Sequence, residues 1–235
     1  MLERMEDILT PKDLKGEKIL ITGGPTQEPM DPVRFITNRS SGKMGYALAN
    51  VAARRGAEVI LISGPTSLSL VRRDIQYVPV RTAEEMREAV FAYLEGSSVV
   101  IKAAAVSDYR PKVISEKKIK KGGPEYSLAL ERTRDILEEL GKKKENRILV
   151  GFAAETEDLV VHAQKKLQEK NLDLIVVNDV TQPGAGFGSD TNQAKILSPS
   201  GQVKDLALAT KEEISGAILD HVVALLKKKE GSRKK

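Results

Sequence analysis

The segment 17–64 reads EKILITGGPTQEPMDPVRFITNRSSGKMGYALANVAARRGAEVILISG, and it decides the fold class. Residues 17–24 and 57–64 are short apolar runs that end in glycine, which is typical of buried strands. Between them, residues 41–56 carry apolar side chains at helical spacing and end in Arg-Arg-Gly, a common helix stop. A strand, a helix and a second apolar strand in this order predict a parallel strand pair covered by the helix.

The same alternation of apolar strands and amphipathic helices continues along the chain. Further strands are expected at 75–80, 97–106, 147–155 and 172–179, and further helices at 82–95, 156–170 and 210–226. Thr82 with Glu85 and Thr210 with Glu213 form capping boxes, and Thr156 is a third candidate helix cap. Two segments predict β-hairpins: residues 109–131, turning at Gly122-Gly123-Pro124, and residues 193–206, turning at Pro199-Ser200-Gly201. The predicted fold is α/β: a Rossmann-like, mostly parallel sheet with helices on both faces and β-hairpin insertions.

The chain is expected to hold one domain between two extensions. Residues 1–16 resemble a leader or linker, residues 17–226 form the domain, and residues 227–235 form a basic tail. Six of the last nine residues are Lys or Arg and one is Glu, so the tail accounts for the formal net charge of +5. Such a tail is more often solvated than bound to a partner. Within the domain, residues 109–131 form a basic flap.

Composition excludes several classes of function. The 235 residues contain no Cys and only two His, which excludes disulfides, thiolate zinc sites, a cysteine nucleophile and a multi-histidine metal site. Aromatic residues make up 4% and Trp is absent, so neither a base-stacking platform nor nucleic acid is expected. No apolar run reaches the length of about 18 residues that spans a membrane, and no export signal opens the chain. We therefore expect a cytoplasmic protein without a membrane partner.

Small residues end the predicted strands, where ligands bind in open parallel sheets. The serines of Ser40-Ser41-Gly42 precede a helix, so this segment is either a phosphate or carboxylate cradle or a plain N-cap. A nicotinamide site is disfavoured, because the helix-opening glycines follow Gly23-Gly24 by about twenty residues. In addition, the second strand ends in Ser63-Gly64 rather than in an acid that binds ribose.

The other candidate ligand-binding residues are lysines. Residues 117–121, KKIKK, lie on one arm of the predicted flap, and strand alternation would place Lys118 and Lys120 on one face. Beside Asp108 they could close over a triphosphate, although a charged edge strand without a ligand is the plainer interpretation. Lys166 and Lys170 share a helix face with His162, which is more often structural than catalytic.

Taken together, the motifs closely resemble those of the phosphopantothenate–cysteine ligase family of coenzyme A biosynthesis. The resemblance covers almost the whole predicted domain, from Glu17 to about Leu226. Its motifs are ITGGPTQEPMDPVRFITNRSSGKMGYALA from Ile21, AAAVSDYRP from Ala103, EKKIKK from Glu116, VGFAAET from Val150, KNLDLIVVNDV from Lys170 and GFGSDTNQ from Gly186.

The resemblance implies roles for individual residues. Asn38 and Lys118 are the implied catalytic residues, Lys118 for forming an acyl-cytidylate and Asn38 for converting it to the amide. The implied substrate-binding residues are Arg34, Asn38, Ser40 and Ser41. Arg34 lies in the segment that is expected to reach the substrate of a neighbouring subunit. The implied nucleotide contacts are Lys118, Ala103, Ala104, Asp108, Asp135, Ile136, Phe152, Lys166 and Lys170. Thr133-Arg134-Asp135-Ile136 departs from the Asn-Pro-Asp-Ile that bacterial relatives commonly carry, which weakens the case for side-chain contacts at its first two positions.

The family reaction requires CTP, with Mg²⁺ on the triphosphate, and uses small-molecule substrates. Its metal ligands cannot be assigned from the sequence. Family members are homodimers, and many are fused to a flavin-dependent decarboxylase that has no counterpart here; an excised domain and a standalone ligase both remain open. Some relatives use ATP in place of CTP. The alternatives are a nicotinamide- or flavin-dependent oxidoreductase and a non-catalytic dimerisation or regulatory domain.

Overall fold

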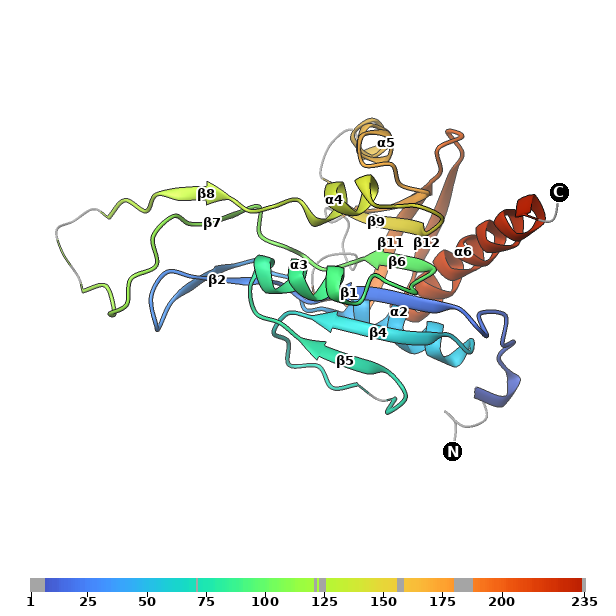
Figure 1. Ribbon diagram of the computed structural model, residues 1–235, viewed down its shortest axis with the longest axis horizontal. Coiled ribbons are helices and arrows are strands. Elements are labelled where there is room, and N and C mark those ends of the chain that lie inside the picture. Colours follow the sequence, from blue (N-terminus) through green and yellow to red (C-terminus); the bar gives the residue numbers. More distant parts are fainter. Residues whose placement is uncertain are drawn as a thin grey trace.

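An eight-stranded sheet organises the protein in the computed structural model (Figure 1). The structure describes residues 7–70, 72–120, 122, 126–155, 159–179 and 188–233. The sheet strands are β1 (Lys18–Gly23), β4 (Glu58–Ser63), β5 (Gln76–Pro79), β6 (Val99–Lys102), β9 (Ile148–Glu155), β10 (Leu174–Asp179), β11 (Thr191–Leu197) and β12 (Val203–Thr210). The helices are α2 (Lys43–Arg54), α3 (Ala83–Ala92), α4 (Ile136–Lys142), α5 (Leu159–Glu169) and α6 (Lys211–Arg233).

The strand order is β12-β11-β10-β9-β6-β1-β4-β5, and the last six of these are mutually parallel. Numbered along the chain, those six lie in the order 3-2-1-4-5-6 of the Rossmann fold, read from the β5 edge. The hairpin β11–β12 extends the sheet in antiparallel fashion and turns at Ser198–Gly201. The predicted mostly parallel Rossmann-like sheet is confirmed.

Helices cover both faces of the sheet, as predicted. On one face α2 and α6 enclose a cluster with Leu48, Val51 and Ile218. On the other face α3, α4 and α5 enclose a second cluster, which includes Met86 and Leu140. Alternate residues of each central strand enter opposite clusters, because strand side chains alternate between faces. Burial on both faces explains why these strands are apolar throughout.

Two ribbons leave the sheet and form an arm that projects beyond it (Figure 1). The ribbon of β2 (Gln27–Pro29) with β3 (Phe35–Thr37) lies beside the ribbon of β7 (Tyr109–Pro111) with β8 (Leu130–Arg132). We use the word arm for residues 27–37 and for the described residues within 109–132. The predicted flap hairpin thus exists at its base, whereas most of its predicted turn lies outside the described residues.

The prediction that the flap lysines alternate on a strand is wrong. Strand pairing stops at Pro111, and the residues from Lys112 to Lys120 are irregular. Their backbone is held instead by the neighbouring ribbon, because Ser115 N–H donates to Met30 O at 2.9 Å. Lys117 and Lys118 are both exposed, so no shared face distinguishes them.

Buried packing begins earlier in the chain, and the last helix ends later, than the sequence predicts. Leu14 is fully buried, and its N–H donates to Arg55 O at 3.1 Å, so core packing begins inside the predicted leader. Helix α6 was expected to end near Leu226, but it continues through the basic tail to Arg233. Lys229 Nζ donates to the carbonyl oxygens of Asn146 at 3.2 Å and Arg147 at 2.8 Å, which anchors the extra turns. The predicted helix cap at Thr156 lies outside the described residues.

Glycines allow α2 to lie directly on β1. A Cβ at Gly45 would stand 2.7 Å from the Gly23 Cα, so the two backbones are in contact. At Gly42, which caps α2, φ is +82° and a Cβ would meet the Thr66 Cγ2 at 2.7 Å. Gly42 and Gly45 follow Gly23 by about twenty residues in the sequence. They nevertheless permit the close packing of helix on strand that the glycines of a Rossmann motif permit.

We expect Gly45→Ala to lower the free energy of unfolding by about 1–3 kcal/mol, because the new methyl group must push α2 off β1. Gly216→Ala in α6 is the matched control. No atom lies within 4 Å of a Cβ there, so this change should stabilise the protein by about 0.5–1 kcal/mol through helix propensity. Urea unfolding of both variants tests the expectation, and equal effects in the two helices would contradict it.

Candidate active site

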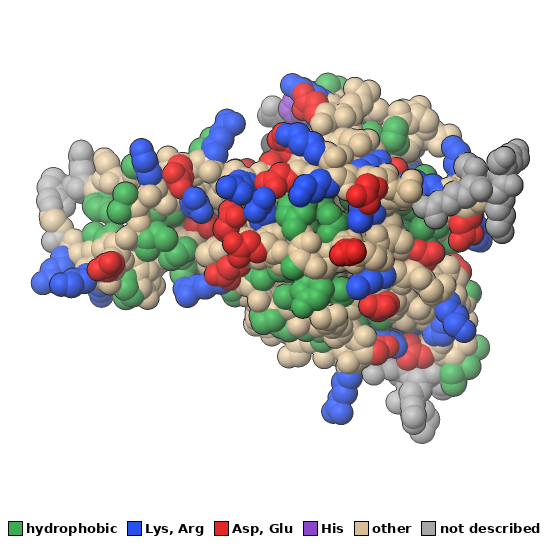
Figure 2. Space-filling model, viewed as in Figure 1, with side chains coloured by type: hydrophobic (Ala, Val, Ile, Leu, Met, Phe, Trp, Pro, Cys, Tyr) green, Lys and Arg blue, Asp and Glu red, His purple; other side chains and the backbone are tan. Residues whose placement is uncertain are grey.

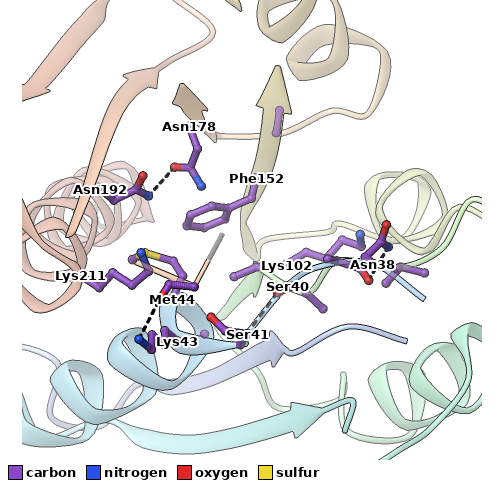
Figure 3. Close-up of a pocket in the computed structure, with 18 of the residues that line it drawn as sticks. Asn38, Ser40, Ser41, Lys43, Met44, Lys102, Phe152, Asn178, Asn192 and Lys211 are labelled. Atoms are coloured by element: carbon purple, nitrogen blue, oxygen red, sulfur yellow. Dashed lines mark hydrogen bonds between the residues drawn. The ribbon is translucent and has the colours of Figure 1, made fainter. Parts of the chain in front are cut away.

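A cleft of about 350 Å³ opens at the carboxyl ends of the central strands, where β1 and β6 mark the reversal of strand order (Figure 3). This is where Rossmann-like sheets bind ligands. Most of its lining comes from strand ends and the start of α2. The lining residues are Asn38, Ser40, Ser41, Gly42, Lys43, Met44, Gly45, Lys102, Ala103, Ala104, Ala105, Val106, Asp108, Phe152, Ala153, Lys166, Asn178, Gly188, Asn192 and Lys211.

The amino terminus of α2 faces this cleft. Its N-cap is Gly42, which has no side chain to cap the helix, and the first turn contains no acidic residue. Ser40 Oγ accepts a hydrogen bond from Gly42 N–H at 3.3 Å, so the serine shapes the approach to the helix instead of capping it. The plain N-cap interpretation is therefore wrong, and the backbone N–H groups of the first turn favour an anion.

Asn38 is fixed against the end of β6. Its Nδ2 donates to Ala105 O at 3.0 Å, and Thr26 N–H donates to the same carbonyl oxygen at 3.2 Å. A parallel bridge between Pro25 and Ala105 extends the β1–β6 pairing at this point. The Asn38 amide thus lies on a rigid part of the fold, with its second N–H and its oxygen available to a ligand.

Two lysines enter the cleft beside α2 and α6. Lys43 Nζ donates to Gly188 O at 2.7 Å and pairs with Asp190 Oδ1 at 2.6 Å. Lys211, the first residue of α6, donates from Nζ to Thr191 O at 2.9 Å. Burial lowers the pKa of Lys211, and the nearby positive charge of Lys43 lowers it further. An anion bound here would relieve that repulsion.

A second lobe of about 540 Å³ adjoins the first, and Lys102, Val106, Asp108, Phe152 and Lys166 line both. Lys170 Nζ binds Asp135 Oδ2 at 2.6 Å, and Asp135 also caps α4 by accepting from Glu138 N–H at 3.0 Å. Burial raises the pKa of Asp135, but the hydrogen bonds from Lys170 and Glu138 outweigh burial and lower it. Burial lowers the pKa of Lys102, which ends β6 between the two lobes. The cleft therefore has lysines at both ends.

Most of the residues that the sequence singled out come together here. The first lobe contains Asn38, Ser40, Ser41, Ala103, Ala104, Asp108, Phe152 and Lys166. The second lobe adds Lys170, Asp135 and Ile136, together with Thr133 and Arg134. His162 is exposed on α5 and lines neither lobe.

Arg34 and Lys118 line neither lobe of their own chain and lie in the arm. Arg34 Nη2 pairs with Asp31 Oδ2 at 2.6 Å and donates to Ile119 O at 3.0 Å, while Ile119 N–H donates to Asp31 Oδ2 at 3.1 Å. The Arg34 guanidinium, with backbone N–H donors, holds the pKa of the Asp31 carboxyl well below its usual range. This ion pair joins the two ribbons beside Lys118.

Sequence reasoning missed several residues of the cleft. Lys102 lies inside the predicted strand 97–106 and ends the observed β6, and a lysine within an apolar run was the signal that could have found it. Lys43 and Met44 follow the Ser-Ser-Gly segment and could have been found with it. Asn192 lies in the GFGSDTNQ motif and Lys211 in the capping box at Thr210, but neither was assigned to the site, because only the antiparallel β11–β12 hairpin brings them back to the cleft.

The fold and the cleft define a Rossmann-like α/β protein whose ligand site lies at the switch point of the sheet. The chain belongs to the DNA/pantothenate metabolism flavoprotein C-terminal domain family, whose family model matches residues 14–226. The family resemblance expected from the motifs is thereby confirmed. No helix among the described residues is long and apolar enough to cross a membrane.

Known relatives agree with this assignment. The chain is 51% identical over 218 residues to the coenzyme A biosynthesis bifunctional protein CoaBC of Bacillus subtilis, covering 93% of this chain and 54% of that protein. It thus spans about half the length of the curated relatives it matches. The crystal structure of the C-terminal domain of a CoaBC protein matches with a TM-score of 0.80 at 45% identity, covering 92% of this chain and 99% of that one. A Cab2 variant in complex with phosphopantothenate-cysteine shares the fold, with a TM-score of 0.76 at 20% identity and coverage of 100% and 95%.

Proposed function

We propose that this domain is a phosphopantothenate–cysteine ligase that joins 4′-phosphopantothenate to L-cysteine at the expense of CTP. The observation that carries the proposal is the continuous cleft with lysines at both ends and Asn38 fixed in its first lobe. Two phosphorylated substrates must meet in such a reaction, and each needs cationic neighbours. The similarity of this chain to CoaBC proteins, which are named for coenzyme A biosynthesis, supports the same reaction.

The proposed chemistry has two steps. A carboxylate oxygen of phosphopantothenate attacks the α-phosphorus of CTP, and pyrophosphate leaves to give an acyl-cytidylate. The amine of cysteine then attacks the acyl carbon, loses a proton and displaces CMP. The protein contributes position and charge rather than a nucleophile, which suits a chain without Cys. Lys102 and Lys166, which line both lobes, would stabilise the phosphate charge, and Asn38 would hold the acyl group.

Magnesium fits this site as a companion of the triphosphate rather than as a resident ion. Among the described residues no group of three or more His, Asp or Glu is arranged to hold a metal. Asp108 lines both lobes and can offer one carboxylate, while Asp135 is engaged by Lys170. Mg²⁺ commonly binds through phosphate oxygens, water and one or two carboxylates, and it would neutralise charge on the leaving pyrophosphate.

A homodimer is the proposed assembly. Arg34 and Lys118 belong to the arm, which projects beyond the sheet (Figure 1) and could reach the cleft of a second copy. The arm also carries exposed apolar side chains, and Figure 2 shows hydrophobic patches on its surface. The exposed apolar residues of the arm are Val33, Phe35, Tyr109, Val113, Ile114, Tyr126 and Leu130. Large exposed apolar patches commonly mark protein interfaces. Fusion to a decarboxylase half is a further proposal, supported by relatives of about twice the length.

Pyrophosphate release tests the proposed function. The purified domain is incubated with Mg²⁺, phosphopantothenate and CTP, ATP, UTP or GTP, first without and then with cysteine. We expect pyrophosphate to require phosphopantothenate, and CMP to appear only after cysteine is added. Nucleotide hydrolysis that ignores phosphopantothenate would contradict the proposal. Bound nicotinamide or flavin absorbance would instead favour the oxidoreductase alternative, which the Ser63-Gly64 end of β4 disfavours.

A further inference from the structure

Glu28 is a buried carboxylate in a part of the molecule that is otherwise mostly exposed. It is the middle residue of β2, at the base of the arm, and it is 2% exposed. Glutamate is seldom buried to this extent without a partner. The partner here is a helix, because the N–H of Ala83, the first residue of α3, donates to Glu28 Oε1 at 3.0 Å. The arm is thereby bonded to the helical layer of the core.

The amino terminus of α3 favours the negative charge of Glu28. The first N–H groups of a helix have no partner within the helix, and the helix dipole adds partial positive charge there. Two side chains from different parts of the molecule cap α3. Thr82 Oγ1, from the N-cap itself, accepts from Glu85 N–H at 3.1 Å, whereas Glu28 reaches the helix from the arm. Figure 1 shows the start of α3 beside the base of β2.

The base of the arm is attached on two sides. Thr26, just before β2, donates from its N–H to Ala105 O at 3.2 Å, directly beyond β6. Gln27 N–H donates to Arg81 O at 2.8 Å, between β5 and α3, and Glu28 bonds to α3 itself. β6 and β5 lie on opposite sides of β1 in the sheet. A ribbon held on one side can pivot, whereas a ribbon held on both sides has a fixed direction.

The direction of the arm also decides where its lysine and arginine side chains lie. Asp31 Oδ2 accepts from Ile119 N–H at 3.1 Å, and Arg34 Nη2 donates to Ile119 O at 3.0 Å, so the two ribbons move together and carry Lys118 with them. A small rotation at the base displaces the far end of the arm by more than it displaces the base. In catalysis, a displacement of about 1 Å can lower a rate on the order of 10²-fold.

We propose that Glu28 is a positioning residue: by capping α3 from β2, it sets the direction in which the arm leaves the sheet, and so brings Arg34 and Lys118 to the cleft of a second copy. This rests on the proposed function, in which two copies share their sites. Glu28 lines neither lobe of the cleft, so it touches no substrate and acts through the arm.

Three variants separate the direction of the arm from the stability of α3. Glu28→Ala leaves the Ala83 N–H without its partner and allows the arm to pivot. Glu28→Gln keeps an oxygen that can accept from Ala83 N–H, so it should retain most of the direction. Thr82→Ala is the matched control, because it removes the other cap of the same helix and leaves the arm attached. It should lower Tm by about 2–4 °C, the shift that one lost cap produces in a domain of this size.

The first measurement is the distance from the arm to the core, which does not depend on activity. The chain contains no Cys, so Lys117→Cys in the arm and Lys165→Cys on α5, both at exposed positions, can carry two spin labels. Labelled chain is diluted with unlabelled chain, so that only distances within one chain are recorded. We expect a narrow distribution in the wild type and in Thr82→Ala, and a broadened or displaced one in Glu28→Ala. An unchanged distribution in Glu28→Ala, or equal changes in Glu28→Ala and Thr82→Ala, would overturn the inference.

The second measurement is pyrophosphate release by the folded variants. Glu28→Ala should lower kcat/KM on the order of 10²-fold, and Glu28→Gln by about tenfold or less, because a neutral acceptor replaces a charged one. Thr82→Ala should match the wild type. When Glu28→Ala is refolded together with Asn38→Asp, about a quarter of wild-type activity should return, because each mixed dimer then contains one intact site.

Absence of this recovery would overturn the inference, because a purely structural role of Glu28 would damage the cleft of its own chain. The proposed function can fail separately. If the wild type releases no pyrophosphate, the ligase assignment is lost, and the spin-label distances still decide whether Glu28 directs the arm.

Discussion

Asn38→Asp is expected to stop the reaction after its first step. The carboxylate cannot donate to Ala105 O, which it would face at about the 3.0 Å now spanned by the Asn38 hydrogen bond, and it adds negative charge beside the phosphates. An acid at this position also cannot donate to the acyl oxygen when cysteine attacks. We expect amide formation to slow by on the order of 10²-fold or more, as when an oxyanion donor is lost.

The measurement is rapid quench with labelled phosphopantothenate and CTP. Acyl-cytidylate should accumulate to about one equivalent per site, whereas the wild type consumes it once cysteine is present. Asn171→Asp is the matched control, because Asn171 Nδ2 also donates to a backbone carbonyl, that of Gly141 at 3.1 Å, and neither residue lines either lobe of the cleft. Wild-type turnover in Asn38→Asp would remove Asn38 from the mechanism.

Lys118→Gln should suppress the first step, and therefore pyrophosphate release, by on the order of 10²-fold through loss of a transition-state charge contact. Glutamine keeps the length and polarity of the side chain but removes its charge. Lys118 lies in the arm beside the Asp31–Arg34 pair and lines neither lobe of its own chain. We therefore expect it to act in the cleft of the second copy of a homodimer.

Mixed dimers decide in which cleft Lys118 acts. When the Asn38→Asp and Lys118→Gln chains are refolded together, a mixed dimer contains one doubly altered site and one intact site if Lys118 serves its partner. Random pairing should then restore about a quarter of wild-type activity. No restoration would assign Lys118 to its own cleft. An active species that sediments only as a monomer would eliminate the shared site.

Lys117→Gln is the control for charge alone. Lys117 is exposed like Lys118, and its carbonyl oxygen accepts from Ser115 Oγ at 2.6 Å, so its backbone is fixed in the same segment. If Lys118 makes a specific contact, Lys117→Gln should leave the rate of pyrophosphate release nearly unchanged. Equal losses in the two variants would mean that the lysine cluster attracts the triphosphate only diffusely.

Local sequence signals determined most of the sheet and its helices. The capping box predicted at Thr210 is present, since Glu213 N–H donates to Thr210 Oγ1 at 3.2 Å and Glu213 Oε2 accepts from Thr210 N–H at 2.8 Å. The sequence also predicts a ligand site at the carboxyl ends of the strands, and the cleft is found there, lined by Ala103 directly after β6 and by Phe152 within β9. These signals depend on only a few neighbouring residues, so they can be recognised without knowing how the rest of the chain folds.

Only the tertiary structure decided the features that depend on distant contacts. Helix α6 continues past its predicted end because Lys229 reaches carbonyl groups more than 80 residues away. The flap is irregular because its backbone binds Met30 and Asp31 rather than a facing strand. Asn192 enters the cleft because the β11–β12 hairpin turns back beside β10. Sequence patterns encode burial and local hydrogen bonding, whereas the order in which strands assemble determines which distant side chains share a site.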